Sequence, residues 1–274
     1  MSMTTASRLG RIAIIGGGNM GQAICAGLLC VEGLQPSSIT VANPGAEKRS
    51  LIASRYGVCT VENCVDALPA DTVFLAVKPA KVPEVLEQLA GAGFDDGLLI
   101  SVAAGVSTEK MSSYVSPQVD IVRVMPNTPL TCGAGMSALS AGAGTSQERV
   151  ELARQVFALM GEAVIVDEGM QDIVTAISGS GPAYFELFIQ CMAKAGGELG
   201  LDESIAQKLA LSTMAGTAKM IACTGQDLDQ AIKAVSSPGG TTVAALDAMR
   251  AGGVCEAIEA GVKAAAARSK ELGA

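Results

Sequence analysis

The sequence predicts an α/β domain built on a mostly parallel sheet, followed by a domain made only of helices. Short apolar runs of strand length alternate with helical patterns through about residue 124. After Asp167 no further β-branched run of strand type appears, although more than a hundred residues remain. We therefore expect two domains, 1–167 and 168–274.

The strands of the first domain are expected where apolar residues cluster in short runs. The first run, 11–15, ends in glycines and reads as a buried strand. Further strands are predicted at 38–42, 71–77, 97–103, 120–124, 136–140 and 163–166. Helical spacing of apolar residues predicts the connecting helices at 19–32, 47–56, 82–90 and 147–160.

The second domain consists of helical segments that are rich in alanine and glycine. They are expected at 170–177, 182–199, 202–223, 227–235, 242–251 and 254–271. Helices with such small side chains fill a core of their own poorly and pack closely against other helices instead. We therefore expect a dimerisation domain that completes its core on a second copy; the alternative is a compact monomeric bundle.

Composition excludes several chemistries. The chain has no histidine, so a Ser-His or Cys-His nucleophile pair, an imidazole general base and a histidine-built zinc site are all impossible. A net charge of −8 argues against nucleic acid as a partner, because phosphate binding needs a basic face. The eight cysteines form no C-x-x-C pair, and no metal site is expected.

Segments that would direct the chain to a membrane or out of the cell are not expected. No apolar run approaches the roughly 18–20 residues of a membrane helix. The first ten residues lack the apolar stretch of a signal peptide. We therefore expect a cytoplasmic protein with reduced thiols and no membrane partner.

A glycine-rich loop directly follows the first predicted strand and opens the first helix. Gly16-Gly-Gly18-Asn19-Met20-Gly21 fits G-x-G-x-x-G in the context that this pattern requires. Gly16 allows the tight turn, Gly18 lets a pyrophosphate approach the backbone, and Gly21 lets helix and strand pack closely. The pattern predicts a Rossmann-type dinucleotide-binding domain, with the phosphates at the helix N-terminus.

The residues after the second strand bear on the choice of dinucleotide. An enzyme that uses NAD usually has Asp or Glu there to bind the ribose hydroxyls, but this chain has Asn43 and no acid before Glu47. Lys48 and Arg49 follow. A 2′-phosphate would not be repelled by Asn43, so NADP(H) is favoured and NAD(H) is the alternative.

Two absences restrict the type of substrate: the chain has no histidine, and one long segment of the chain has no lysine or arginine. Reduction of a ketone forms an alkoxide, which needs a proton donor such as His, Lys or Tyr. A two-domain 3-hydroxyacid dehydrogenase, which carries out such a reaction, is expected to have a lysine on the long helix after the sheet. Residues 155–193 contain neither Lys nor Arg. An imine fits better, because its protonated form already carries the positive charge that attracts hydride. A non-catalytic NADP-binding sensor is the third alternative.

Two loops before helices could hold a ligand. The segment 236–242, Ser-Ser-Pro-Gly-Gly-Thr-Thr, exposes backbone N–H groups and hydroxyls, which suit a carboxylate. The segment 178–184, Ser-Gly-Ser-Gly-Pro-Ala-Tyr, allows close approach of a ligand or a partner chain. The alternative for 236–242 is an ordinary turn with a threonine cap, and the alternative for 178–184 is helix–helix packing without a ligand.

Five motifs in order resemble the pyrroline-5-carboxylate reductase family. They are Ile-Gly-Gly-Gly-Asn-Met-Gly (15–21), Ala-Val-Lys-Pro (76–79), Arg-Val-Met-Pro-Asn-Thr-Pro (123–129), and the two loops at 178–184 and 236–242. The resemblance implies NAD(P)H-dependent reduction of 1-pyrroline-5-carboxylate to L-proline, the last step of proline biosynthesis. It also implies a homodimer formed by exchange of the helical domains, with a decamer as a further assembly.

The resemblance also implies roles for individual residues. The catalytic residue should be Thr242, which would hydrogen-bond the substrate nitrogen, while the substrate carboxylate should be held by Ser237, Gly240 and Thr241. Beyond the glycine loop and Asn43, the residues expected to line the dinucleotide are Val77, Lys78, Pro79, Ala103 and Asn127. The small residues that follow Ala103 should form a wall beside the nicotinamide.

Overall fold

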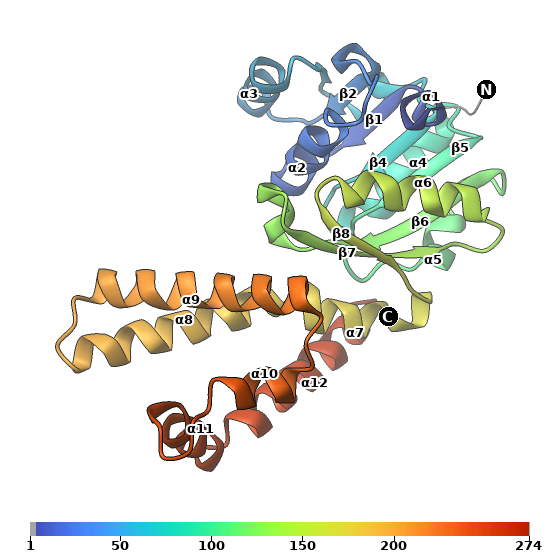
Figure 1. Cartoon of the computed structure of the whole chain (residues 1–274). Helices are drawn as coiled ribbons and strands as arrows, with labels where there is room; N and C mark the ends of the chain where they lie inside the picture. The colour runs from blue at the N-terminus through green and yellow to red at the C-terminus, as the bar shows by residue number, and fades with distance from the viewer. Residues whose placement is uncertain (1–3, 274) are drawn as a thin grey trace. The chain divides into compact units, whose positions relative to one another are not determined.

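The computed structural model describes residues 4–273, which form two compact units (Figure 1). The first unit comprises residues 4–180 together with 265–273, and the second comprises 181–264. The first carries all the strands and the second is entirely helical, which confirms the predicted fold class.

The first unit is built on one eight-stranded sheet, in the order β3-β2-β1-β4-β5-β6-β7-β8. All neighbouring strands are parallel except β6 and β7, which pair antiparallel. The strands are β1 (Ile12–Ile15), β2 (Ile39–Ala42), β3 (Cys59–Val61), β4 (Thr72–Leu75), β5 (Gly97–Ser101), β6 (Val119–Met125), β7 (Gly135–Ala141) and β8 (Gly161–Ile165).

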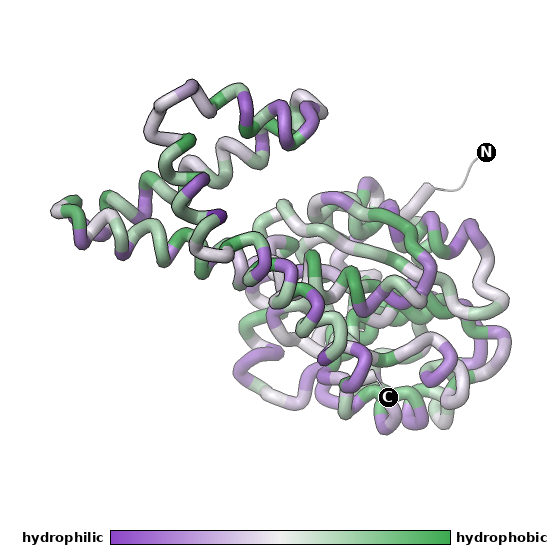
Figure 2. Tube along the Cα trace, turned by 90° about the horizontal axis from the view of Figure 1, so that it is seen from below, coloured by the Kyte–Doolittle hydropathy of each residue, from purple (hydrophilic) through white to green (hydrophobic). Residues whose placement is uncertain are grey.

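Alternate strand residues supply two separate cores, one on each face of the sheet. Ile12 and Ile14 of β1 belong to the core under α2 (Asn19–Leu28), α3 (Ala46–Tyr56) and α6 (Gln147–Ala158). Ala13 and Ile15 belong to the core under α4 (Val82–Gly91) and α5 (Thr108–Ser112). Burial on both faces explains why the central strands are mainly apolar, and Figure 2 shows much of the interior of the first unit in green.

One strand and two α-helices of the first unit were not predicted. Strand β3 has three residues, and helices α1 (Thr5–Leu9) and α5 have five each, so none of them is long enough to show a hydrophobic period. Both helices begin at a hydroxyl cap: Thr4 Oγ accepts from Ser7 N–H, and Ser107 Oγ accepts from Lys110 N–H.

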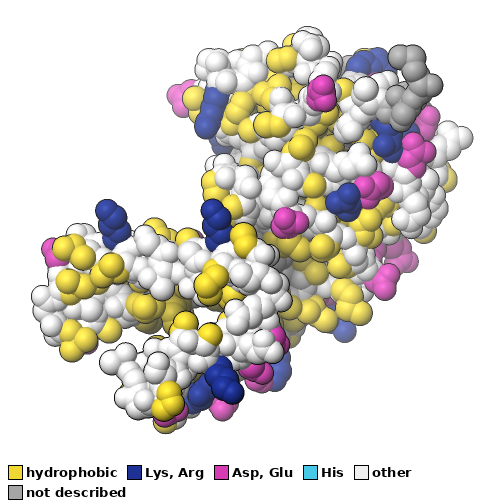
Figure 3. All heavy atoms as spheres, in the orientation of Figure 1, with side chains coloured by type: hydrophobic (Ala, Val, Ile, Leu, Met, Phe, Trp, Pro, Cys, Tyr) yellow, Lys and Arg dark blue, Asp and Glu magenta, His cyan; other side chains and the backbone are white. Residues whose placement is uncertain are grey.

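The second unit contains α8 (Gly181–Glu198), α9 (Glu203–Thr224), α10 (Leu228–Ala234), α11 (Thr241–Ala251) and the start of α12 (Val254–Gly273). Its buried apolar side chains are all alanines, at positions 193, 206, 210 and 231. Large apolar side chains such as Phe185, Leu187, Leu209 and Leu211 are more than half exposed, and Figure 3 shows hydrophobic surface over α8 and α9. The unit therefore has no large-residue core of its own.

The compact units divide at a different place from the predicted domains. The strands end before 167 as expected, but the next segment stays with the sheet as a 3₁₀ turn (η5, Glu168–Met170), α7 (Gln171–Val174) and a π-helical turn (η6, Thr175–Gly179). The last turns of α12, from Ala265 on, also belong to the first unit. The domain boundary at 167/168 thus remains a prediction. The chain leaves the first compact unit after Ser180 and returns to it at Ala265.

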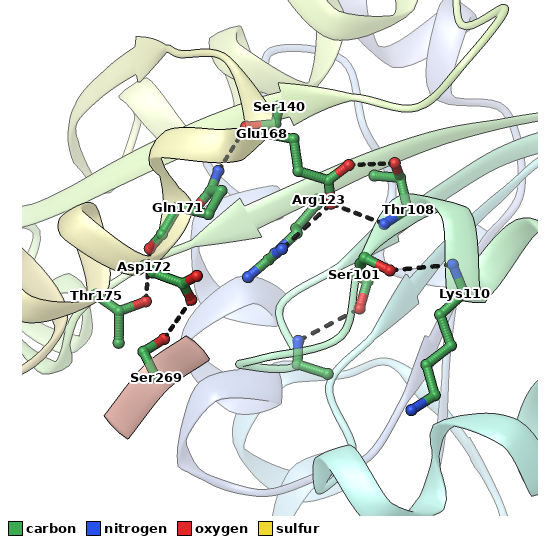
Figure 4. A network of polar contacts seen from close by, with 12 residues as sticks. Ser101, Thr108, Lys110, Arg123, Ser140, Glu168, Gln171, Asp172, Thr175 and Ser269 are labelled. Atoms are coloured by element: carbon green, nitrogen blue, oxygen red, sulfur yellow. Dashed lines mark hydrogen bonds and ion pairs between the residues drawn. The ribbon is translucent and has the colours of Figure 1, made fainter. Parts of the chain in front are cut away.

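An ion pair fixes the segment after the sheet. Arg123 of β6 has a side chain only 9% exposed, and its Nη1 lies 3.2 Å from Glu168 Oε1 (Figure 4). The same oxygen accepts from Thr108 N–H at 2.7 Å, and Glu168 Oε2 accepts from the Thr108 hydroxyl. Glu168 thereby joins the sheet, the start of α5 and the beginning of the helical region.

Two further hydrogen bonds anchor α7 and the end of α12. The wholly buried Gln171 donates from Nε2 to Ser140 Oγ at 2.7 Å and to Ala138 O at 3.3 Å. Ser269 Oγ of α12 donates to Asp172 Oδ1 at 2.7 Å (Figure 4). These bonds explain why both segments cluster with the sheet.

All eight cysteines are free in the structure. Burial raises the pKa of the Cys25 thiol to about 11, so this thiol stays protonated and unreactive at neutral pH. Within residues 4–273, no helix is long and apolar enough to cross a membrane, and no cluster of three or more His, Cys, Asp or Glu side chains could hold a metal ion.

Replacing Glu168 by alanine should destabilise the first unit. Glu168→Ala leaves the nearly buried Arg123 cation without its partner, and we expect it to lower the free energy of unfolding by about 2 kcal/mol. The control is Glu84→Ala, whose partner Lys81 is 63% exposed on its side chain, with an expected cost below about 1 kcal/mol. Urea unfolding followed by circular dichroism at one protein concentration measures both; equal costs would contradict the structural role of Glu168.

Candidate active site

The predicted cofactor-binding residues gather at one edge of the sheet. Strands β1, β2, β4, β5 and β6 are parallel, so their carboxyl ends lie at the same edge. The glycine loop follows β1, Asn43 follows β2, Val77–Pro79 follows β4, Ala103 follows β5 and Asn127 follows β6. In open α/β sheets this edge is where ligands bind, at the point where the strand order reverses.

The glycine loop is held tightly between neighbouring strands. Gly16 has φ +109°, and a Cβ there would overlap Ala76 O, the carbonyl just after β4. A Cβ on Gly21 would overlap Gly16 O, so the first turn of α2 rests directly on the strand end. Both positions therefore require glycine for the fold itself.

Gly18 is different, because nothing in the protein requires glycine there. Its φ of −71° suits any residue, and an added Cβ would meet no heavy atom within 4 Å. It is the N-cap of the ten-residue helix α2, whose first turn, at Asn19, Met20 and Gly21, has no side-chain cap. Open space beside uncapped N–H groups is a cradle that fits a pyrophosphate.

Asn43 links the ends of β1 and β2. Its Oδ1 accepts from Gly17 N–H at 3.3 Å and its Nδ2 donates to Gly45 O at 3.3 Å. Arg49 of α3 donates from Nη1 to Asn43 O at 2.8 Å and to Pro44 O at 2.7 Å. Its Nη2 donates to Glu62 Oε2 at 3.1 Å, a carboxylate that the sequence interpretation did not include because β3 was not predicted.

A cavity of about 610 Å³ opens at the ends of β4 and β5. Its lining includes Pro79, Ala104 and Gly105 from the predicted residues, and Ser269 and Leu272 from the end of α12. Val77 lies beside Gly16, where an added Cβ would approach its side chain to 3.3 Å, while Ala103 is 3% exposed and Lys78 is exposed. The cavity walls are mainly apolar, as expected beside an uncharged ring.

Asn127 lies at the same edge, but both ends of its amide bind other groups of the protein. Its Oδ1 accepts from Met136 N–H at 2.8 Å, and its Nδ2 donates to Ser178 O at 3.1 Å. It therefore ties the π-helical turn to β7. Contact of this residue with a dinucleotide remains a prediction.

The predicted substrate residues lie together at the start of α11. Gly240 is the N-cap of this helix without a side-chain cap, and Thr241 and Thr242 occupy its first turn. The Gly240 N–H donates to Ser237 O at 2.9 Å, which closes the turn and leaves the next N–H groups pointing beyond the helix end. This arrangement can bind a carboxylate and offers hydroxyls beside it.

The predicted site residues thus fall into two groups. The dinucleotide residues belong to the first unit, and Ser237, Gly240, Thr241 and Thr242 belong to the second. The strand order of the sheet, the glycine loop and the uncapped α2 define a dinucleotide-binding oxidoreductase fold of the Rossmann type.

Comparison with known proteins identifies the family. Residues 168–272 match the model "Pyrroline-5-carboxylate reductase dimerisation", and residues 11–105 match "NADP oxidoreductase coenzyme F420-dependent". The pyrroline-5-carboxylate reductase of Haemophilus influenzae is 43% identical over 264 residues, covering 95% of this chain and 97% of that one. The chain belongs to the pyrroline-5-carboxylate reductase family.

Solved structures agree with this assignment. A pyrroline-5-carboxylate reductase from Coxiella burnetii has 35% identity and a TM-score of 0.90, covering 97% of this chain and 99% of that one. The Plasmodium falciparum pyrroline carboxylate reductase, solved with NADP bound, has 26% identity and a TM-score of 0.86, with coverage of 97% and 99%.

A side chain at position 18 should weaken dinucleotide binding without unfolding the protein. We expect Gly18→Val to change the free energy of unfolding by less than about 1 kcal/mol, because its Cβ enters open space. The dissociation constant for NADPH should rise about tenfold or more, because the valine occupies the cradle.

Calorimetric titration with NADPH measures the change in affinity. The matched control is Gly169→Val, at an exposed glycine whose Cβ would likewise meet nothing within 4 Å. Unchanged NADPH affinity in Gly18→Val would exclude the loop as the pyrophosphate site.

Proposed function

We propose that this chain reduces 1-pyrroline-5-carboxylate to L-proline with a nicotinamide dinucleotide, the last step of proline biosynthesis, in the cytoplasm. Family membership over nearly the whole chain carries the proposal. The alternative of a 3-hydroxyacid dehydrogenase needs a cation after the sheet, yet 155–193, which covers α7, the π-helical turn and the start of α8, contains neither Lys nor Arg.

The chemistry requires little from protein side chains. A nicotinamide held beside the glycine loop would supply a hydride for C2 of the substrate ring, the carbon double-bonded to nitrogen, whose C=N electron pair would move to the nitrogen. Since the protonated imine starts with a positive charge, the nitrogen becomes a neutral secondary amine and takes a proton from water. No alkoxide forms, so the chain needs no histidine to neutralise one.

The N-terminus of α11 accounts for the substrate carboxylate. The N–H groups of Thr241 and Thr242 and the Ser237 hydroxyl carry partial positive charge at a helix end, which favours an anion. Gly240 contributes by lacking a Cβ, which would approach Ser237 O at 2.9 Å and fill the space beside the helix end. The Thr242 hydroxyl then holds the ring nitrogen.

The active enzyme is proposed to be a homodimer formed through the helical unit. A core of alanines alone, beside exposed Phe185, Leu187, Leu209 and Leu211, leaves apolar surface that a second copy would bury. The family model that matches this region describes dimerisation. Exchange of helical domains, assembly of dimers into a decamer and completion of each active site by two chains remain predictions.

NADPH is the proposed reductant. The end of β2 carries Asn43 where an acid would bind the ribose hydroxyls of NADH, and Arg49 places a guanidinium beside the same loop. A 2′-phosphate in this position would meet a neutral amide and a cation.

The reaction assay tests the function directly. Purified protein, NADPH and 1-pyrroline-5-carboxylate are mixed, and the loss of nicotinamide absorbance and the formation of proline are measured. Proline should form in equal amount to the NADPH consumed. A folded protein that binds NADPH but consumes none in the presence of this imine would refute the proposal.

Removing the Thr242 hydroxyl should reduce turnover. Thr242→Val is expected to lower kcat roughly five- to thirtyfold, equivalent to about 1–2 kcal/mol for one hydrogen bond to a charged group. NADPH affinity should stay within about twofold, because the residue lies in the other unit. Thr217→Val, an exposed threonine of α9 with its hydroxyl bonded to Thr213 O, is the control; an unaltered kcat in Thr242→Val removes this residue from the mechanism.

Introducing a carboxylate at position 43 should change the preferred cofactor. Asn43→Asp keeps the acceptor for Gly17 N–H but places a negative charge where the 2′-phosphate of NADPH would lie. We expect the ratio of kcat/KM for NADPH to that for NADH to fall about tenfold. If steady-state kinetics with the two cofactors give the wild-type ratio, the specificity lies elsewhere.

A further inference from the structure

The edge strand β3 carries a carboxylate to the dinucleotide end of the sheet. β3 pairs in parallel with β2, with Val61 opposite Ala42, and Asn43 N–H donates to Val61 O at 3.0 Å. The next residue, Glu62, therefore lies beside the end of β2, where Rossmann proteins bind the adenosine ribose. Its position there depends on an element that sequence patterns did not reveal.

Glu62 forms an ion pair with Arg49. Its Oε2 lies 3.1 Å from Arg49 Nη2, and the Glu62 side chain is 62% exposed whereas that of Arg49 is 19% exposed. Arg49 also donates to the carbonyls of Asn43 and Pro44 through Nη1. These contacts hold the guanidinium against the loop that follows β2.

The guanidinium still has capacity for a ligand. An arginine carries five N–H donors in a fixed fork, and the three hydrogen bonds described use only part of them. A phosphate at the end of β2 would therefore find remaining donors and the charge of Arg49. Glu62 occupies one donor of the guanidinium and neutralises part of its charge, so Arg49 attracts the phosphate less strongly than an unpaired arginine would.

We propose that Glu62 is a specificity-determining residue, which acts through Arg49 to limit the preference for a 2′-phosphorylated dinucleotide. Arg49 is the cation that favours the phosphate, and Glu62 restrains it by pairing with it. The carboxylate that Rossmann enzymes usually place directly after β2 is thus replaced by one that directly follows the neighbouring strand β3 and contacts Arg49. This inference rests on the proposed use of NADPH.

The test measures binding of the adenosine half of the cofactor alone. Adenosine 2′,5′-bisphosphate and adenosine 5′-monophosphate differ only in the 2′-phosphate, and neither requires turnover. Dissociation constants from calorimetry at low ionic strength give the preference for the 2′-phosphate as a ratio. A failure of the reaction assay therefore leaves this measurement unaffected, and the reverse also holds.

Glu62→Gln should increase that preference. We expect the dissociation constant of adenosine 2′,5′-bisphosphate to fall about three- to tenfold, with the monophosphate changing less than about twofold, because the Arg49 guanidinium, no longer paired with a carboxylate, is left to bind the phosphate. The gain should shrink at high salt. The control Glu151→Gln removes the same charge from the Arg154 pair of α6 and should leave the ratio unchanged.

A double mutant tests the route through Arg49. Arg49→Gln should lower the preference for the 2′-phosphate, and adding Glu62→Gln to it should have little further effect. A full Glu62→Gln effect in the Arg49→Gln background would overturn the role of Arg49. An unchanged ratio in Glu62→Gln alone, or an equal gain in Glu151→Gln, would overturn the whole proposal.

Discussion

The parallel pairing of β1 with β2 on one side and β4 on the other is the constraint on which the first unit depends. Ile15 lies opposite both Ala42 and Leu75, so the three strands end at the same height. Gly16 N–H donates to Ala42 O at 2.9 Å and Ala76 N–H donates to Ile15 O at 2.8 Å. The glycine loop after β1, Asn43 after β2 and the segment after β4 that lines the apolar cavity all begin at this shared edge.

The parts of the fold that could be predicted from sequence are those buried on both sides. Apolar residues of β1 and β4 alternate between the two cores, and only Thr72 at the start of β4 is polar, so both strands appear as apolar runs in the sequence. The glycines at 16 and 21 were predictable as well, since backbone atoms occupy the space of their missing side chains. The all-helical second unit followed from the absence of strand patterns after 167.

The features that sequence patterns missed depend on long-range contacts between short or polar elements. Strand β3 is only three residues long, and without it the nearness of Glu62 to Arg49 could not be foreseen. The compact unit extends to Ser180 because Glu168 and Gln171 bond to strands, and a side chain that bonds across such a distance leaves no period in the sequence. The two hydrogen bonds of the Asn127 side chain, with Met136 N–H and Ser178 O, also join separate elements of the chain and could not be foreseen for the same reason.

The return of α12 to the first unit affects the order in which the protein can fold during synthesis. The hydrogen bond between Asp172 and Ser269 joins residues 97 positions apart, and the whole helical unit lies between them. Closing so long a loop is entropically costly and slow compared with local helix formation. The sheet can thus assemble while the chain still emerges from the ribosome, but the cavity wall that includes Ser269 and Leu272 is added only after the second unit has been made. The glycine loop can therefore form before the cavity is complete.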